Sequence, residues 1–396
     1  KNTAIGNKLT NTARNSVVIG YNLKGGQGAL NIGRDNTGTV GTNSLVIGVN
    51  SSASNNGVAI GHTANAGTNG FSVGINTTTG TNGVSFGTSV KSGSSGIGIG
   101  ISSEGMGNNA VAIGRANVVR GNNSVGIGYG NTTSGNSATV FGRSNSVSRS
   151  NFVAGRNNTS IDQATVHGDN NKSISKFSKV WGDGNENLID NTSAYGDNNK
   201  NFKQLVNIFG DDNKDFYDIK IYGSGNFGSG TGSSVSANGG YIFGGINQQT
   251  GGGNIYGSNN IITDGGDAYG RDNTITDFGY AFGHSNIVDD EAFAYGFGNI
   301  VDGTTTKAYG FGEGNQATLG GFGFGKDTIA ANGGITLGTE VQATGVGSIA
   351  IGRKIQATGE GSIGIGLDGT TEVVSANNTL SIMGGAVAIG KTAAGA

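Results

Sequence analysis

Residues 15–20 read Asn-Ser-Val-Val-Ile-Gly, and residues 43–48 read Asn-Ser-Leu-Val-Ile-Gly. Large apolar side chains stand one and three places before the glycine, with one further residue between them. Alternation with a period of two over four to six residues predicts a short β-strand. The glycine permits a positive φ or a close backbone approach, which a corner needs. Each string therefore predicts one strand followed by one corner.

The pattern recurs along the whole chain. An apolar residue followed by glycine appears mostly at intervals of roughly 13–15 residues, from Ile5–Gly6 to Ile389–Gly390 and including Tyr309–Gly310. A unit this short cannot bury a core alone and must stack on its neighbours. We therefore predict an all-β, elongated β-solenoid (β-roll) of about 28 coils, roughly 130 Å long at a strand spacing of ~4.8 Å.

Two steps in the series are long. The step from Gly223 to Gly244 and the step from Gly366 to Gly390 both exceed the usual interval. We expect the surplus of the first step, Gly225–Gly240, to leave the stack as a loop, and we expect the strand Leu380–Ile382 to lie off the series. Both ends of the chain lie within the repeat pattern, so we expect either a longer array or ends covered by partners.

The composition narrows the class of protein. Of 396 residues, 79 are Gly, and the chain contains neither Pro nor Cys. Helices are disfavoured because each interior Gly costs about 1 kcal/mol relative to Ala. The formal net charge of -2 argues against a nucleic-acid partner. Every apolar run is too short to cross a bilayer as a helix, so no membrane insertion by a helix is expected.

The middle of the chain differs from both ends. Between Phe141 and Phe324 the residue before the glycine is mostly aromatic, with Trp181 the only tryptophan. An Asn stands three places after the glycine at positions Asn145, Asn158, Asn171, Asn185, Asn199, Asn213, Asn226, Asn247, Asn260, Asn273, Asn286 and Asn299. A second apolar column follows at Val147, Ile161, Ile174, Leu188, Phe202, Phe216, Ile275, Val288 and Val301.

We interpret this middle segment as the coil of the two end segments with a larger core and a different corner. The alternative is a β-solenoid of another shape, joined end to end with the two end segments. Stacked Asn side chains predict a hydrogen-bonded ladder, and Asn also tolerates the left-handed region. The aromatic column predicts buried ring ladders. A sugar-binding role for these rings is disfavoured, because Ile fills the same column at both ends of the chain, where we expect it in the core.

Seven strings share one form: NSVVIG (15–20), NSLVIG (43–48), NGVAIG (56–61), NAVAIG (109–114), NSVGIG (123–128), GSIAIG (347–352) and GSIGIG (361–366). They resemble the head repeats of trimeric autotransporter adhesins, the YadA-like left-handed β-roll. The resemblance is clearest at residues 1–141 and 326–396. It divides the chain into two segments of YadA-like repeats, 1–141 and 326–396, and an Asn- and aromatic-rich solenoid segment, 142–325, with an insertion near 225–240.

The resemblance implies a homotrimer on the bacterial cell surface, hence an extracellular location. It implies a non-enzymatic adhesin head that attaches in several copies to host matrix, cells or other bacteria, through a surface protein or glycan. The alternative is a self-assembling extracellular filament or fibre subunit, including a phage fibre shaft, because a solenoid end can template the next strand. We expect no cofactor, and neither binding residues nor the ligand can be identified.

One column of carboxylates suggests an ion site. Asp169, Asp183, Asp197 and Asp211 each follow a series glycine, so they would stack at strand spacing and repel one another. Calcium could bridge them. Counter-charge from Lys172, Lys200 and Lys214, three places further on, is the alternative and the favoured explanation. We therefore assign no metal site and keep calcium as the weaker hypothesis.

The sequence offers little for catalysis. The three histidines, His62, His167 and His284, lie in distant repeats, so we expect no zinc cluster and no Ser-His-Asp set within one chain. His167 occupies the column before the glycine and is expected to be buried or stacked, while His62 and His284 are expected to face solvent. Adjacent carboxylates such as Asp211 and Asp212 would face opposite sides of a strand. We predict that the chain is not an enzyme.

Overall fold

The computed structural model describes residues 1–188, 190–201, 207–215, 219–223, 227–228, 240–250, 253–304 and 306–385. These residues form strands and turns, with no helix among them. Nothing in the described ranges forms a helix long and apolar enough to cross a membrane. The chain divides into two compact units, Lys1–Leu205 and Val206–Ala396.

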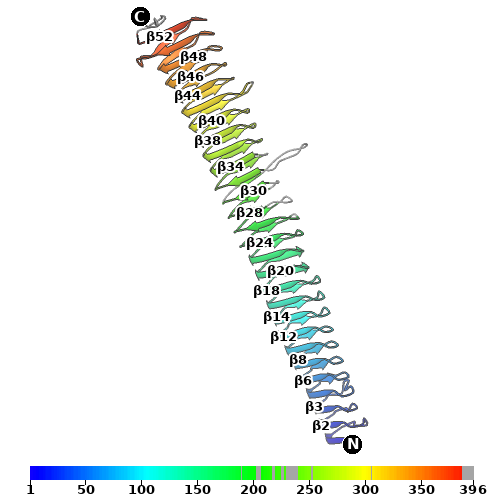
Figure 1. The fold of residues 1–396 in the computed structure, drawn as a ribbon. Coiled ribbons are helices and arrows are strands. Elements are labelled where there is room, and N and C mark those ends of the chain that lie inside the picture. Colours follow the sequence, from blue (N-terminus) through cyan, green and yellow to red (C-terminus); the bar gives the residue numbers. More distant parts are fainter. Residues whose placement is uncertain are drawn as a thin grey trace, which may run out of the picture. The chain divides into compact units, whose positions relative to one another are not determined.

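Each coil contains one long strand, one short strand and two corners. In the first unit, for example, β14 (Val111–Arg115) is followed by β15 (Val118–Val119) and then by β16 (Val125–Tyr129). β14 and β16 pair in parallel, with Ile113 opposite Ile127 and Gly114 opposite Gly128. Equivalent residues of successive coils therefore stack directly on one another, as Figure 1 shows within each unit.

The strands of the first unit form two parallel sheets. The long-strand sheet contains β1 (Thr3–Asn7), β2 (Val17–Tyr21), β3 (Leu30–Arg34), β4 (Leu45–Val49), β6 (Val58–His62), β8 (Phe71–Ile75), β10 (Val84–Thr88), β12 (Ile97–Ile101), β14, β16, β18 (Thr139–Arg143), β20 (Phe152–Arg156), β22 (Thr165–Asp169), β24 (Lys179–Trp181) and β26 (Ser193–Tyr195). The short-strand sheet contains β5 (Ser52–Ala53), β7 (Asn65–Ala66), β9 (Thr78–Thr79), β11 (Lys91–Ser92), β13 (Glu104–Gly105), β15, β17 (Thr132–Thr133), β19 (Ser146–Arg149), β21 (Thr159–Asp162), β23 (Lys172–Ser173), β25 (Glu186–Asn187) and β27 (Lys200–Asn201).

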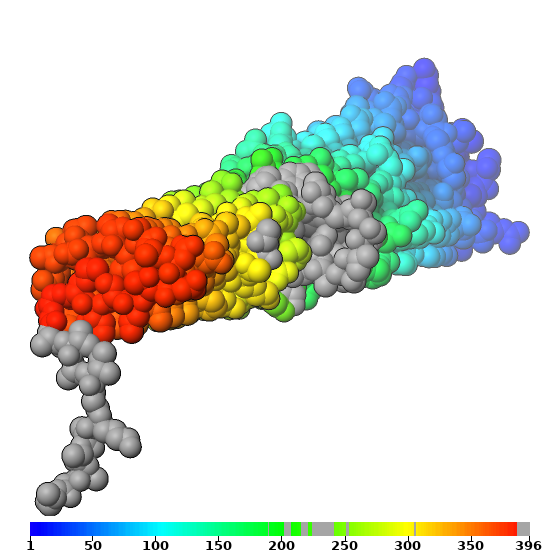
Figure 2. All heavy atoms as spheres, turned by 90° about the horizontal axis from the view of Figure 1, so that it is seen from above, coloured from blue at the N-terminus to red at the C-terminus, as the bar shows by residue number. Residues whose placement is uncertain are grey.

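The second unit repeats this plan, and its coils, yellow to red, lie one behind another in Figure 2. Its long strands are β28 (Asn207–Phe209), β30 (Ile219–Tyr222), β32 (Gly240–Phe243), β34 (Gly253–Ser258), β36 (Asp267–Arg271), β38 (Tyr280–His284), β40 (Phe293–Phe297), β42 (Tyr309–Glu313), β44 (Phe322–Lys326), β46 (Ile335–Thr339), β48 (Ile349–Arg353), β50 (Ile363–Gly366) and β52 (Leu380–Met383). Its short strands are β29 (Lys214–Asp215), β31 (Phe227–Gly228), β33 (Gln248–Thr250), β35 (Ile261–Thr263), β37 (Thr274–Thr276), β39 (Ile287–Asp289), β41 (Ile300–Asp302), β43 (Gln316–Thr318), β45 (Ile329–Ala330), β47 (Gln342–Ala343), β49 (Ile355–Ala357) and β51 (Glu372–Val374).

The predicted fold class is confirmed. The chain is an all-β, parallel β-solenoid of about 27 turns. Strand pairing continues across both predicted segment boundaries, since β18 pairs with β20 and β44 pairs with β46. The boundaries at 141/142 and 325/326 are therefore changes of side-chain composition within one coil plan.

Two predictions of register are wrong. Gly312, not Gly310, stands opposite Gly296, so the aromatic residue of this coil that continues the series is Phe311 rather than Tyr309. β52 does lie on the series, because Ile382 pairs with Ile365 and Met383 takes the glycine position opposite Gly366. The predicted last member of the series, Ile389–Gly390, lies outside the described residues.

The predicted loop Gly225–Gly240 lies mostly outside the described residues. The strands on either side of it pair directly, with Ile221 opposite Ile242 and Tyr222 opposite Phe243. The stack of long strands therefore continues across this insertion.

Most coils hold small side chains in their interior. The larger core predicted for the middle segment is present in four of its coils, where the interior position two places before the corner glycine is filled by Ile208, Ile221, Ile242 and Ile255. Val18, Ala59 and Ala112, each two places before a corner glycine, are 0% exposed. The residues on either side of them, such as Val17 and Ile19, are only half-buried. The prediction that the column before the glycine lies in the core is therefore wrong. So short a coil leaves a narrow space between its two sheets, and the aromatic side chains and many of the large aliphatic ones therefore point outward.

The second apolar column is only partly interior. Val147, Ile275, Val288 and Val301 are buried, whereas Ile161 and Ile174 are 44% and 37% exposed. In those two coils the buried position belongs to Ser160 and Ser173, one residue earlier. Leu188 is half-buried, and Phe202 and Phe216 lie outside the described residues.

The corner glycines stack too closely for any side chain. Gly61 has a φ of +136°, and a Cβ built there would lie 1.9 Å from the carbonyl oxygen of Gly74. Gly128 has a φ of +124°, and its Cβ would lie 2.0 Å from the carbonyl oxygen of Gly142. The recurrent glycine is therefore required both by backbone conformation and by contact with the next coil.

Asn side chains form the predicted ladder inside the corner. The backbone N–H of Asn145 donates to Asn131 Oδ1 at 3.1 Å, its Nδ2 donates to the same oxygen at 3.0 Å, and Nδ2 also donates to the Gly155 carbonyl at 2.8 Å. Equivalent buried side chains are Asn117, Asn131, Asn158, Asn171, Asn185 and Asn199 in the first unit and Asn213, Asn247, Asn260, Asn273, Asn286, Asn299 and Asn315 in the second. The predicted member Asn226 lies outside the described residues. The left-handed residue is the one before the ladder Asn, for example Ser144 with a φ of 55°. The Asn is therefore selected for its amide, not for left-handed tolerance.

Candidate functional site: the outer face of the long-strand sheet

The long-strand sheet presents three columns of side chains outward, which we call its outer face. They stand three places before, one place before and one place after the corner glycine. Many are large and apolar, and Phe86, Ile101 and Tyr295 are 53%, 53% and 61% exposed. Soluble monomers rarely expose extended apolar patches, and such patches mark sites of interaction. The outer face is therefore the principal candidate for function.

In the second unit one column of the outer face is a stack of aromatic rings. Its members are Phe209, Tyr222, Phe243, Tyr256, Tyr269, Phe282, Tyr295, Phe311 and Phe324. Tyr269 and Phe282 lie 4.6 Å apart with rings 2° from parallel. Such pairs contribute about 0.5–1.5 kcal/mol each beyond area burial. The predicted ring ladder therefore exists, but it lies on the outer face and not in the core.

The ring stack is interrupted at Tyr295. This ring lies 6.4 Å from Phe282 and 6.4 Å from Phe311, and the ring planes are tilted by 33° and 29°. A shallow apolar hollow of about 350 Å³ lies beside it, lined by Tyr269, Phe282, Tyr295 and two corner glycines. Burial, with the nearby Asp267 carboxylate, raises the pKa of Tyr269.

His167 lies in the corresponding column of the first unit. It is half-buried, and its ring lies 5.1 Å from that of Phe152 and 5.0 Å from that of Trp181. The prediction of a stacked ring is confirmed. His62 is exposed, as expected.

His284 is not simply solvated. Its Nε2 lies 2.9 Å from Asp272 Oδ2, and its Nδ1 lies 3.1 Å from Ser285 Oγ. The statement that no Ser-His-Asp set can assemble is therefore wrong, because residues about one period apart lie on adjacent coils. A guanidinium nitrogen of Arg271 also lies 2.8 Å from the same Nε2, so this nitrogen is shared between a donor and an acceptor. The sharing does not fix the imidazole as a base for Ser285.

The predicted Asp column is hydrogen-bonded to the backbone. Asp169 Oδ1 accepts the Arg156 N–H at 2.8 Å, and Asp183 Oδ1 accepts the Asp169 N–H at 2.7 Å. Asp197 Oδ1 accepts the Asp183 N–H at 2.7 Å. These bonds stabilise stacked carboxylates without a cation. Asp211 is exposed and lies on the other unit.

The lysines do not pair with this column as expected. Lys172 Nζ lies 2.8 Å from Glu186 Oε1, and Lys200 Nζ lies 3.9 Å from Glu186 Oε2. Lys172 and Lys200 therefore flank a glutamate on the short-strand sheet, and Lys214 is exposed.

Within the described ranges, the acidic groups close enough to share one cation are those of Asp277, Asp289 and Asp290, whose oxygens lie within 4.8 Å of one another. Desolvation, together with the carboxylates of Asp290, Asp289 and Asp264, raises the pKa of Asp277. The group is not apparent in the linear sequence, because its members come from neighbouring corners.

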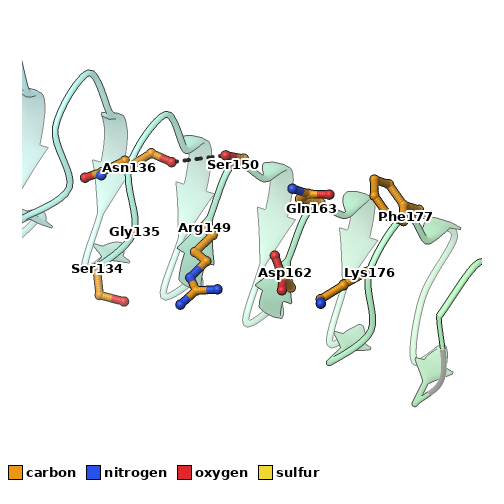
Figure 3. A pocket seen from close by; sticks show the side chains of 9 residues that line it. All are labelled: Ser134, Gly135, Asn136, Arg149, Ser150, Asp162, Gln163, Lys176 and Phe177. Atoms are coloured by element: carbon orange, nitrogen blue, oxygen red, sulfur yellow. Dashed lines mark hydrogen bonds between the residues drawn. The ribbon is translucent and has the colours of Figure 1, made fainter.

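A polar hollow of about 610 Å³ follows the opposite corner of the first unit (Figure 3). Figure 3 shows its side chains in two rows: Ser134, Arg149, Asp162 and Lys176 in one, and Asn136, Ser150, Gln163 and Phe177 in the other. Ser150 Oγ donates to the Asn136 carbonyl at 3.5 Å. The lining contains no histidine, and its one carboxylate stands between two cations. It offers polar contacts rather than acid–base chemistry.

These features define a repeat protein of the parallel β-solenoid class, with an apolar and aromatic outer face. No protein-family model matches the sequence, and no curated protein matches it.

Proposed function

We propose that the chain is a head segment of a non-enzymatic adhesin on the outside of a bacterial cell. Copies of the chain associate through two columns of the outer face, those three places and one place before the corner glycine, and the remaining surfaces, including the column after the glycine, attach to host matrix, cells or other bacteria. The observation that carries the proposal is the exposure of large apolar side chains in register along the long-strand sheet, such as Phe71 (42%) and Phe86 (53%).

The interior of most coils holds Ala, Val, Ser and Asn side chains, and Ile enters it mainly in the second unit, so a single chain buries few large apolar side chains. Association would remove the two columns before the corner glycine from water, which stabilises the contact by about 25 cal/mol per Å² of apolar surface. Because paired strands place the residues of these columns opposite one another, the contact extends over successive coils within each unit.

The repeat strings support three copies. They resemble the heads of YadA-like trimeric autotransporters, in which the homotrimer is the functional unit. Three copies would also present each surface column three times, so avidity can compensate for weak single contacts.

The test is the solution mass by light scattering across a hundredfold range of concentration. We expect a constant mass three times 39.5 kDa. The double substitution Ile113→Ser with Ile127→Ser should lower the mass to that of the single chain, whereas Asn108→Ser on an exposed corner should not. A stable monomer at every concentration would refute the proposal. A mass that climbs with concentration would favour the alternative, a filament or fibre subunit.

A further inference from the structure

Charge is strongly segregated between the two units. Residues 1–205 contain 16 Lys and Arg against 8 Asp and Glu, whereas residues 206–396 contain 8 against 18. The near-neutral total therefore hides a basic unit and an acidic unit. Within the basic unit, residues 105–161 contain five arginines, no lysine and no acidic residue.

Three of these arginines share one column with a tyrosine. Arg115, Tyr129, Arg143 and Arg156 each follow a corner glycine, and successive members stand opposite one another in the parallel register. We call these four residues the edge column. All four are exposed, and they occupy four consecutive coils of the long-strand sheet.

The tyrosine holds two of the guanidinium groups in place. The Arg115 guanidinium lies 5.6 Å from the centre of the Tyr129 ring, and that of Arg143 lies 5.4 Å from it. Both distances are in the range of cation–π contacts. The two cations are thus positioned about two coil spacings apart, roughly 10 Å, before any ligand arrives.

The positive charge of the edge column is left largely uncompensated. Arg156 pairs with Asp169 at 3.0 Å, but across the described residues neither Arg115 nor Arg143 has a carboxylate within 4.0 Å. Arg143 and Arg156 stand directly opposite each other on paired strands, where like charges are destabilising. The next residues of this column, Asp169 and Asp183, are hydrogen-bonded by backbone N–H groups. Along this line of side chains, the unpaired cations Arg115 and Arg143 are therefore followed by the paired Arg156 and then by hydrogen-bonded carboxylates.

From these observations we infer that the edge column binds an anionic polysaccharide bearing sulfate groups. Guanidinium groups bind such oxyanions through two parallel hydrogen bonds, which explains why the cations here are arginines. The faces of Tyr129 lie against the two guanidiniums, which leaves no ring face for a stacked nucleobase, as single-stranded nucleic acid would need. A polymer lying along the stack would meet the unpaired cations Arg115 and Arg143 two coils apart.

This inference rests on the proposed function for its setting, since it gives the attachment surface a class of ligand. The two can fail separately. Binding to a sulfated polysaccharide is measured by calorimetry and affinity chromatography, whereas association is measured by mass. A monomer that binds the sulfated polysaccharide would overturn the proposed trimer and support binding at the edge column. A trimer that does not bind it would support the proposed association and overturn the binding inference.

The experiment uses the full chain and heparin as a sulfated probe. The variant Arg115→Ala with Arg143→Ala is compared with Arg120→Ala with Arg149→Ala, which removes the same charge from the same coils away from the edge column. We expect the first variant to elute from heparin at clearly lower salt and to lower the salt slope of log K by about 2, one unit for each lost contact. We expect the control to lower it by much less.

A third variant tests the positioning role of Tyr129. Tyr129→Leu keeps all charges but frees the guanidiniums, so affinity should fall while the salt slope stays unchanged. Equal losses in the two arginine variants would overturn the inference, because binding would then follow net charge alone. It would also be overturned if the chain is not retained at physiological salt, or if single-stranded DNA of equal charge binds more tightly than heparin.

Discussion

Removing one rung of the Asn ladder should destabilise the first unit locally. In Asn145→Ala the backbone N–H of Asn158 loses its acceptor, which lies 2.9 Å away, and the Gly155 carbonyl loses its donor at 2.8 Å. Both groups lie inside the corner. A buried group left unsatisfied costs about 1–3 kcal/mol, so we expect a loss of about 2–4 kcal/mol for the pair. The position itself tolerates small apolar residues, since Ala64 occupies it in another coil.

Two variants control this experiment. Asn136→Ala removes one bond of 2.9 Å to the backbone N–H of Asn122, but that N–H faces water, so the loss should stay below about 1 kcal/mol. Asn145→Thr should fall between the two, because Thr328 continues the ladder in the second unit by donating to Asn315 Oδ1 at 2.6 Å.

Unfolding of a repeat protein need not be two-state, so the assay is local. Hydrogen exchange of the Asn158 amide, measured with the urea unfolding curve, should show a loss of protection in Asn145→Ala and none in Asn136→Ala. An Asn158 amide that exchanges as slowly in the variant as in the parent chain would refute the reasoning.

Four further results are expected. Gly128→Ala should lower the free energy of unfolding by more than about 3 kcal/mol. Gly130→Ala should lower it by only about 1–2 kcal/mol, because the atom nearest to a Cβ added there lies 3.7 Å away. Similar losses in the two variants would contradict the close stacking of the corner glycines. Asp277→Asn should raise the Tm at neutral pH, because the raised pKa of Asp277 means that its ionised carboxylate opposes folding. The gain in Tm should vanish as the pH falls below 3.8, where the carboxyl group is protonated in both the folded and the unfolded chain. Asp272→Asn should lower the Tm at neutral pH, because the hydrogen bond from Asn259, together with Arg271 and His284, lowers the pKa of Asp272 in the folded chain. The stability that the ionised carboxylate contributes is lost as the pH falls through this lowered pKa. A difference in Tm that persists in strong acid would contradict the prediction. EDTA should leave the Tm unchanged, since backbone N–H groups stabilise the column at Asp169, Asp183 and Asp197; a fall in Tm would restore the calcium hypothesis.

The sequence predicts the repeat and the strands well, because alternation determines which side chains share a face. It does not by itself determine which face is inside. Val18 and Ile19 are both apolar, and only the narrow gap between the sheets places Val18 inside and Ile19 outside. Gly126, two places before a corner glycine, was an available signal, since a large interior column would not contain glycine.

The strand register of the coil that contains Gly312 could also have been predicted from the sequence. Both Tyr309–Gly310 and Phe311–Gly312 fit the dipeptide pattern, but Asn315 stands three places after Gly312 and so identifies the corner. The Ser285–His284–Asp272 set is not evident from the sequence for a different reason. Asp272 lies about one period before His284 and Ser285 in the chain, and a solenoid places residues one period apart side by side.

The stacked corner glycines have a consequence for how such a chain can change in length. Each corner glycine meets the next through the same short approach to a carbonyl oxygen, so in a regular stretch the junction between any two coils resembles every other junction. Deleting residues 115–128, one complete period, would bring Gly114 against Gly142 in the register that Gly128 now holds. Gene duplication or loss of whole periods can therefore set how far the molecule reaches, without any new interface having to evolve.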